Sequence, residues 1–222
     1  MSYLFRLFIC LGLLLGPAGL SAQLINSKAD FQAALQASQE LKENGLLVFR
    51  LESNHLKTAH YQKLLANKNL KAKKRKKVER LLQNMQAETQ AINQTIIRAL
   101  QDTFDFCPLY FCYDTSAQYI RKGGRSQVLL NAQGEKDPSI SMPDSLAIYW
   151  LYYEPAGGAN TFNSLQLRPL KGQLRPPFPS QTIIRKSWVH NQSLPRLRRA
   201  VPEIQRRLQR LYERAQKEAQ KE

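Results

Sequence analysis

The stretch SLAIYWLYYE, from Ser145 to Glu154, carries the strongest β-strand signal in the chain and decides the fold class. Its two alternating sets of side chains are both apolar, which predicts a strand covered on both faces. Two shorter runs, LLVFRL at 46–51 and CPLYFCY at 107–113, combine β-branched, aromatic and leucine side chains and are predicted as further interior strands. We therefore expect an α/β domain whose sheet is enclosed by helices.

Helices are predicted before and between these strands. Residues 27–44 place apolar side chains on one helical face, with Ser27 as N-cap. Residues 55–103 keep helical spacing over a long stretch, and Asn67 and Asn69 predict a break that yields an antiparallel helical hairpin. Smaller elements are expected at 115–120 (helix), 127–131 (strand) and 162–167 (strand, reached through a hairpin at 155–161).

The C-terminal part is predicted to be a connection followed by a helix. Residues 169–200 are rich in proline and arginine and lack steady periodicity, which indicates an ordered surface connection. A last helix is expected over 201–220, because Pro202 and Glu203 suit a first helical turn. Residues 23–222 are thus expected to form a single three-layer α/β domain with a mixed sheet, a helical-hairpin insertion and a basic C-terminal helix.

The first 22 residues have the order of a secretory signal peptide. Arg6 precedes a short apolar run, and small residues that include Ala18 and Ala22 follow it. The run is shorter than the roughly 20 residues of a membrane span. We expect cleavage near Ala22 and a periplasmic or secreted protein, with peripheral association with the envelope. Lipidation at Cys10 and retention as an uncleaved anchor are the alternatives.

The formal net charge of +16 is the outlying compositional property. So basic a surface attracts polyanions, and the alternative explanation is solubility. The C-terminal quarter carries most of the excess, since residues 160–222 hold 14 Lys and Arg against four Glu. Two helical regions have clustered basic residues, and a solvated helix face is the alternative explanation for each. The candidate anion-binding residues are Lys73, Lys74, Arg75, Lys76 and Lys77 in the hairpin, and Arg207, Arg210, Arg214 and Lys217 on the last helix.

The sequence contains no metal-binding or catalytic motif that outweighs a structural explanation. His55, His60 and His190 are its three histidines, and the first two are five residues apart, so they do not share a helix face as ligands four apart would. A nucleophile elbow, a phosphate-binding loop and a dinucleotide fingerprint are all missing from the sequence. We expect no cofactor or metal, and a non-enzymatic protein more than an enzyme. A hydrolase whose residues converge only in three dimensions stays open.

Cys107 and Cys112 are the cysteines left after signal cleavage and the candidate redox residues. An extended strand would place them on opposite faces and about 16 Å apart, whereas a disulfide requires Cα atoms within about 7 Å. Two buried thiols are the first expectation. A bridge allowed by a bulge at Pro108, an intermolecular bond and a reactive thiol are the alternatives.

Two resemblances follow from these motifs. The element order from residue 46 onward resembles a thioredoxin-like arrangement, and SMPD at 141–144 is similar to the Ser-x-Pro segment of that family, which usually holds a cis proline. The chain departs from that family after its first strand, where ESNH at 52–55 replaces Cys-x-x-Cys. FCPLYF at 106–111 with PPFP at 176–179 resembles a family of uncharacterised exported bacterial proteins, which implies an α/β domain and an envelope location.

The main hypothesis is a non-enzymatic exported protein that binds anionic envelope material or an acidic partner through basic helical surfaces. An anionic membrane surface, a polysaccharide and an acidic protein are the expected kinds of partner, and a specific nucleic acid is not. Neutralising Arg207, Arg210 and Arg214 is expected to weaken association with anionic membranes at low salt. The alternative is a divergent thioredoxin-like thiol protein that uses Cys107 or Cys112.

Overall fold

The computed structural model describes most of the chain, and the statements below concern those residues. They are residues 28–155, 162–170, 172, 174, 176–185 and 193–221. The predicted signal peptide, the predicted N-cap Ser27 and residues 156–161 of the predicted hairpin connection lie outside the described residues.

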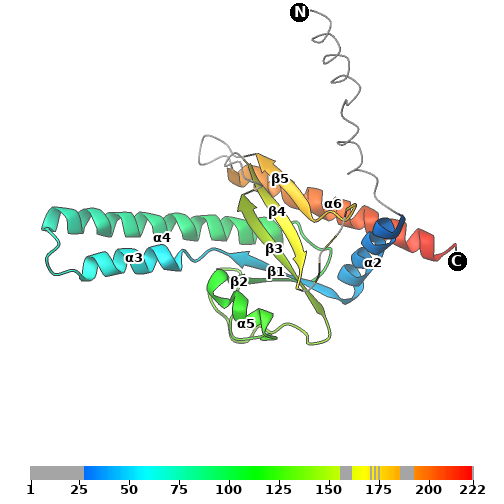
Figure 1. Cartoon of the computed structure of the whole chain (residues 1–222), viewed down its shortest axis with the longest axis horizontal. Helices are drawn as coiled ribbons and strands as arrows, with labels where there is room; N and C mark the ends of the chain where they lie inside the picture. Colours follow the sequence, from blue (N-terminus) through cyan, green and yellow to red (C-terminus); the bar gives the residue numbers. More distant parts are fainter. Residues whose placement is uncertain are drawn as a thin grey trace, which may run out of the picture.

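A five-stranded mixed sheet forms the centre of the protein (Figure 1). Its strand order is β2-β1-β3-β4-β5, in which β2, β1 and β3 are parallel and β4 and β5 continue as antiparallel neighbours. The strands are β1 (Gly45–Leu51), β2 (Leu109–Tyr113), β3 (Ala147–Pro155), β4 (Phe162–Pro169) and β5 (Gln181–Arg185). The predicted α/β fold with a mixed sheet is confirmed.

Strand β1 lies between two parallel neighbours and is buried on both faces. Every residue of β1 except Arg50 is buried, as the apolar run from Leu46 to Phe49 predicts. Leu47 and Phe49 point to one hydrophobic cluster, and Leu46 and Val48 point to the other. The alternation of side chains along the strand therefore divides the core into two layers.

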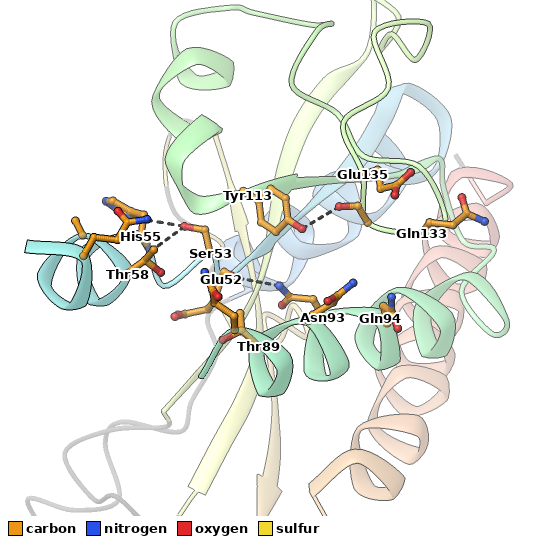
Figure 2. A pocket seen from close by; sticks show the side chains of 15 residues that line it. Glu52, Ser53, His55, Thr58, Thr89, Asn93, Gln94, Tyr113, Gln133 and Glu135 are labelled. Atoms are coloured by element: carbon orange, nitrogen blue, oxygen red, sulfur yellow. Dashed lines mark hydrogen bonds between the residues drawn. The ribbon is translucent and has the colours of Figure 1, made fainter. Parts of the chain in front are cut away.

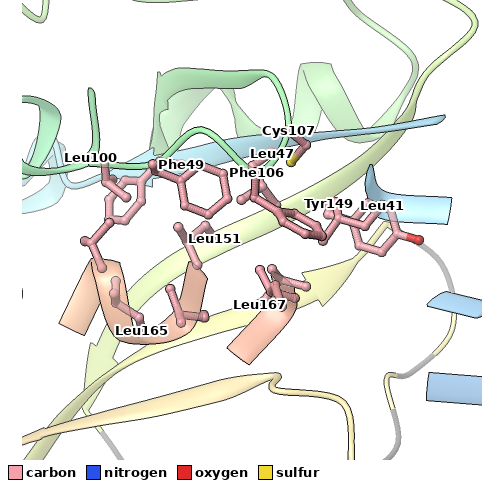
Figure 3. Close-up of a cluster of buried hydrophobic side chains, with 14 of the residues drawn as sticks. Leu41, Leu47, Phe49, Leu100, Phe106, Cys107, Tyr149, Leu151, Leu165 and Leu167 are labelled. Carbon is pink, nitrogen blue, oxygen red and sulfur yellow. The ribbon is translucent and has the colours of Figure 1, made fainter. Parts of the chain in front are cut away.

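Three helices cover one face of the sheet. They are α2 (Lys28–Asn44), the C-terminal part of α4 (Ala72–Gln101) and α6 (Ser193–Ala219). Their apolar side chains pack on Phe49, Leu151 and Leu165 from the strands, and Leu41 of α2 and Leu100 of α4 join this cluster (Figure 3). This cluster has more buried side chains than the cluster on the other face of the sheet. Because burial of apolar surface stabilises by about 25 cal/mol per Å², this layer contributes the larger share of the stabilisation.

A thinner layer covers the other face of β2, β1 and β3. It consists of a 3-10 turn, η1 (Asp114–Ser116), the short helix α5 (Ala117–Arg121) and the loop that follows. Ile120 and Leu129 from this layer pack on Val48 and Trp150. The three layers are thus present but unequal, with the helices concentrated on one side.

Helices α3 (His55–Ala66) and α4 form the predicted hairpin, which projects from the sheet (Figure 1). None of residues 55–92, all of which the structure describes, is buried, and the buried residues of α4 begin at Asn93. We call residues 55–92 the arm. Helix α4 has 30 residues and is therefore about 45 Å long, so most of it lies beyond the core.

The structure differs from the predicted elements in two regions. Residues 127–131 form isolated bridges, such as Cys112 with Leu129, in place of a strand, because the chain turns again at once. The predicted connection at 169–200 contains β5 and the beginning of α6. Pro202 lies inside α6, although proline normally begins or interrupts a helix. Because of this preference, the predicted start at residue 201 is eight residues downstream of the observed start at Ser193.

Candidate functional site

The basic cluster predicted in the hairpin lies at the tip of the arm. Lys73, Lys74, Lys76 and Lys77 are all exposed there. The arm holds ten Lys and Arg residues against two Glu, which accounts for half of the net charge of +16. We call these four lysines the tip lysines.

Arg75 differs from the tip lysines because its guanidinium forms hydrogen bonds within the protein. Its guanidinium donates hydrogen bonds to the carbonyl oxygens of Leu65, at 2.7 Å, and Asn67, at 3.1 Å. These carbonyls belong to the C-terminal end of α3, where the helix supplies no donors of its own. Arg75 therefore joins the two helices of the arm and is less available to a ligand.

The second predicted cluster, on α6, lies at the other end of the molecule (Figure 1). Two of its members have partners within the protein: Arg207 donates to the carbonyl oxygen of Gln181 at 3.1 Å, and the guanidinium of Arg214 lies 4.4 Å from the ring centroid of Phe31. Arg210 and Lys217 are exposed. The fold therefore does not bring the two basic clusters together into one surface.

Cys107 and Cys112 are both buried, and neither forms a disulfide within the part of the chain that the structure describes. They belong to different hydrophobic clusters on opposite faces of the sheet. Burial raises the pKa of each thiol to about 12, although Lys42 and Arg50 partly oppose the rise. A nucleophilic thiolate is thus disfavoured at neutral pH.

A groove lined mainly by residues with polar side chains lies at the root of the arm, where β1 and β2 end (Figure 2). Its volume is about 610 Å³, and its walls come from α3, from α4 and from the loop at 133–135. This volume falls within the range of ordinary ligand pockets. Ligands of open α/β sheets commonly bind at the carboxyl ends of parallel strands, which is the position of this groove.

Three hydrogen bonds fix the walls of the groove. Asn93 Nδ2 donates to the carbonyl oxygen of Glu52 at 2.7 Å, which attaches α4 to the end of β1. Asn54 has a left-handed backbone with a φ of 52°, and its Nδ2 donates to Thr89 Oγ1 at 2.8 Å. The Tyr113 hydroxyl donates to the carbonyl oxygen of Gly134 at 2.8 Å. The groove is therefore built from elements that are held in place.

Ser53, His55 and Asp114 meet at one end of this groove. His55 Nδ1 lies 3.3 Å from Ser53 Oγ and 3.6 Å from Asp114 Oδ2. In a serine-histidine-aspartate relay the nucleophile and the carboxylate contact different ring nitrogens. Here both approach Nδ1, and Asp114 Oδ1 accepts hydrogen bonds from the backbone N–H groups of Ser53 and Thr115. The geometry is that of a turn between two strand ends and not of a hydrolase relay.

The groove was not predictable from the sequence. Its lining comes from four separate parts of the chain, at 52–62, 86–94, Tyr113 and 133–135, and its amide side chains form no recognisable sequence motif. The available signal was positional: polar residues follow directly after two interior strands, at 52–55 and at Asp114. That pattern indicates a shared edge of the sheet but not the ligand.

No protein-family model, curated protein or solved structure matches this chain. The two resemblances therefore rest on sequence motifs alone. The cis peptide bond found among the described residues is Pro176–Pro177, and the bond before Pro143 is trans. In the described ranges, no group of three or more His, Cys, Asp or Glu side chains could hold a metal ion. No described helix combines the length and apolar character required to cross a membrane.

Proposed function

We propose that this chain is an exported, non-enzymatic binding protein that contacts anionic envelope material through the tip lysines of its arm. One observation carries the proposal. Ten of the basic residues lie in an arm that has two acidic residues and no fully buried side chain. Like charges on neighbouring helical turns destabilise a helix, so this concentration has a cost for folding. A ligand that neutralises the charge offsets that cost.

The arrangement of the tip lysines favours contact with an extended anionic surface. Lys73, Lys74, Lys76 and Lys77 lie at successive angles around a helix of 3.6 residues per turn, so they face several directions near its end. An arm that meets a surface with its tip can use all four of them. Lysines near an anionic lipid surface each contribute about 1 kcal/mol. We therefore propose anionic phospholipid headgroups as the material bound.

Vesicle flotation of the mature chain, residues 23–222, tests this proposal. Vesicles of phosphatidylglycerol with phosphatidylcholine are expected to bind the protein at low salt and to release it as salt rises, because screening weakens exposed charge interactions. Vesicles of phosphatidylcholine alone are expected not to bind it. Replacing the four tip lysines with Gln is expected to lower the bound fraction at least tenfold.

A matched variant separates the two basic surfaces. It replaces Arg207, Arg210, Arg214 and Lys217 with Gln and so removes four charges from α6, the same number that the tip variant removes from the arm. The sequence alone predicts weaker membrane association when Arg207, Arg210 and Arg214 are neutralised. Because Arg207 and Arg214 have partners within the protein, we instead expect this variant to keep most of the vesicle binding. If it loses binding while the tip variant retains it, α6 is the contact surface and the assignment to the arm is wrong. Equal binding to both vesicle compositions would reject the proposed ligand altogether.

A further inference from the structure

The groove at the root of the arm differs in charge from the rest of this basic protein. The chain has 33 Lys and Arg residues, yet none of the described residues that line the groove is Lys or Arg. The carboxylates of Glu52 and Glu135 line it instead (Figure 2), and neither forms an ion pair with another described residue. An anionic ligand is therefore disfavoured here, in contrast to the tip of the arm.

A row of three amide side chains forms one wall of the groove. Gln86, Gln90 and Gln94 follow one another at intervals of four on α4, so they lie on one side of the helix about 6 Å apart. None of the three makes a side-chain hydrogen bond with the described part of the chain. Each amide therefore offers two donor hydrogens and one acceptor oxygen to a ligand.

The spacing of this row matches an extended polypeptide. An extended chain advances about 6.6 Å for every two residues, and the groups along its backbone alternate between N–H donors and C=O acceptors. The amide of Gln can pair with both kinds of group. From Gln86 to Gln94 the row covers about 12 Å, which corresponds to roughly four extended residues.

We propose that the groove binds an extended peptide segment that carries a basic side chain. The glutamine row on α4 pairs with the peptide backbone, and Glu52 and Glu135 pair with the lysine or arginine side chain of the ligand. This inference is independent of the function proposed for the arm, since the two sites differ in position and in charge preference. The protein then has one site for an anionic surface and one for a cationic peptide.

Fluorescence polarisation with labelled hexapeptides tests the proposal. The probes are alanine-serine hexapeptides, blocked at the C-terminus and joined to the dye at the N-terminus, with one Lys at each position in turn, and matched peptides that carry Glu or Gln there. Binding of the Lys series and none of the Glu series is expected. Gln90→Trp fills the groove and is expected to raise Kd at least tenfold. Asn84→Trp, at an exposed amide of α4 that does not line the groove, is the matched control and is expected to leave Kd unchanged.

The double substitution Glu52→Gln with Glu135→Gln tests the charge preference. It is expected to weaken binding of the Lys peptides by about two- to tenfold, as two solvent-exposed ion pairs would. Equal Kd values for Gln90→Trp and the wild type, or equal binding of the Lys and Glu series, would overturn the proposal. Binding of maltohexaose, a neutral oligosaccharide, without binding of any peptide would assign the groove to a different ligand class. The variant without tip lysines is expected to retain peptide binding, which separates this result from the vesicle experiment.

Discussion

The guanidinium of Arg75 donates a hydrogen bond to the carbonyl oxygen of Leu65 at 2.7 Å, and this contact joins the start of α4 to the end of α3. Arg75 lies within a run of basic residues that sequence alone treats as equivalent. Its neighbours are exposed, whereas Arg75 is half-buried. The planar guanidinium can reach two carbonyl oxygens at once, which a lysine ammonium does with less geometric fit. One residue of the cluster therefore stabilises the arm, and the others are available to a ligand.

Arg75→Ala is expected to loosen the end of α3 while the core stays intact. Loss of its hydrogen bonds should reduce local stability by about 1 kcal/mol, which corresponds to roughly fivefold faster amide exchange in the last turn of α3. Hydrogen-deuterium exchange measures this directly. Lys76→Ala removes the same charge from an exposed position and is expected to leave the exchange rates of α3 unchanged. Equal acceleration by both variants would mean that charge, and not the contact with Leu65, controls the arm.

Asn93 is the first buried residue of α4, and its amide attaches the helix to the end of β1. Its side chain donates to the carbonyl oxygen of Glu52 at 2.7 Å, and the residue is 5% exposed. Asn93→Leu leaves that carbonyl without its partner, which is expected to lower the free energy of unfolding by about 1–3 kcal/mol. Urea unfolding followed by circular dichroism measures the change. Asn84→Leu, at an exposed position of the same helix, is expected to change it by less than about 0.5 kcal/mol.

Glu154 holds two arginines on the sheet face that lacks a long helix. Its carboxylate lies 2.8 Å from Arg50 and 3.3 Å from Arg168, and both guanidiniums stack near the ring of Tyr152, at 4.6 and 5.1 Å. Glu154→Gln leaves the two positive charges facing each other, so we expect a loss of about 1 kcal/mol in unfolding free energy. In a double-mutant cycle, Arg168→Gln should cost less in the Glu154→Gln background than in the wild type. Strict additivity would show that the two side chains do not interact.

The parts of the fold that were predictable have a strong and continuous physical signal. Strands β1 and β3 are buried on both faces and therefore appear as nearly continuous apolar runs. The arm was predictable because helical spacing persists over a length that only a long hairpin can explain. Strand β5 was missed because it is five residues long and lies among prolines and arginines. Its place in the sheet depends on pairing with β4, which local sequence does not encode.

The candidate sites also differ in whether a local sequence signal or only the tertiary fold identifies them. The basic tip was found because its residues are consecutive in the chain. The separate functions of Arg75 and its neighbours were not found, since they depend on which side chain reaches the end of α3. The groove could not be found at all, because Gln90, Glu52 and Glu135 belong to three segments that only the tertiary fold brings together. Sites assembled in this way leave no periodic or local pattern in a single sequence.

Because Cys107 and Cys112 are buried, we expect their thiols to be labelled slowly in the native protein and the protein to lose stability at high pH. Burial raises the pKa of Cys107 and Cys112 from about 9 to about 12, so the thiolate available at pH 8 is about a thousandfold lower than in the unfolded chain. The folded state therefore binds these protons more tightly, and the resulting stability is fully present below pH 9 and is lost as pH rises toward 12. Thiol labelling of residues 23–222 at pH 8 is expected to require denaturant. Rapid labelling of the native protein, or a disulfide found by intact mass, would contradict this prediction and favour the thiol alternative.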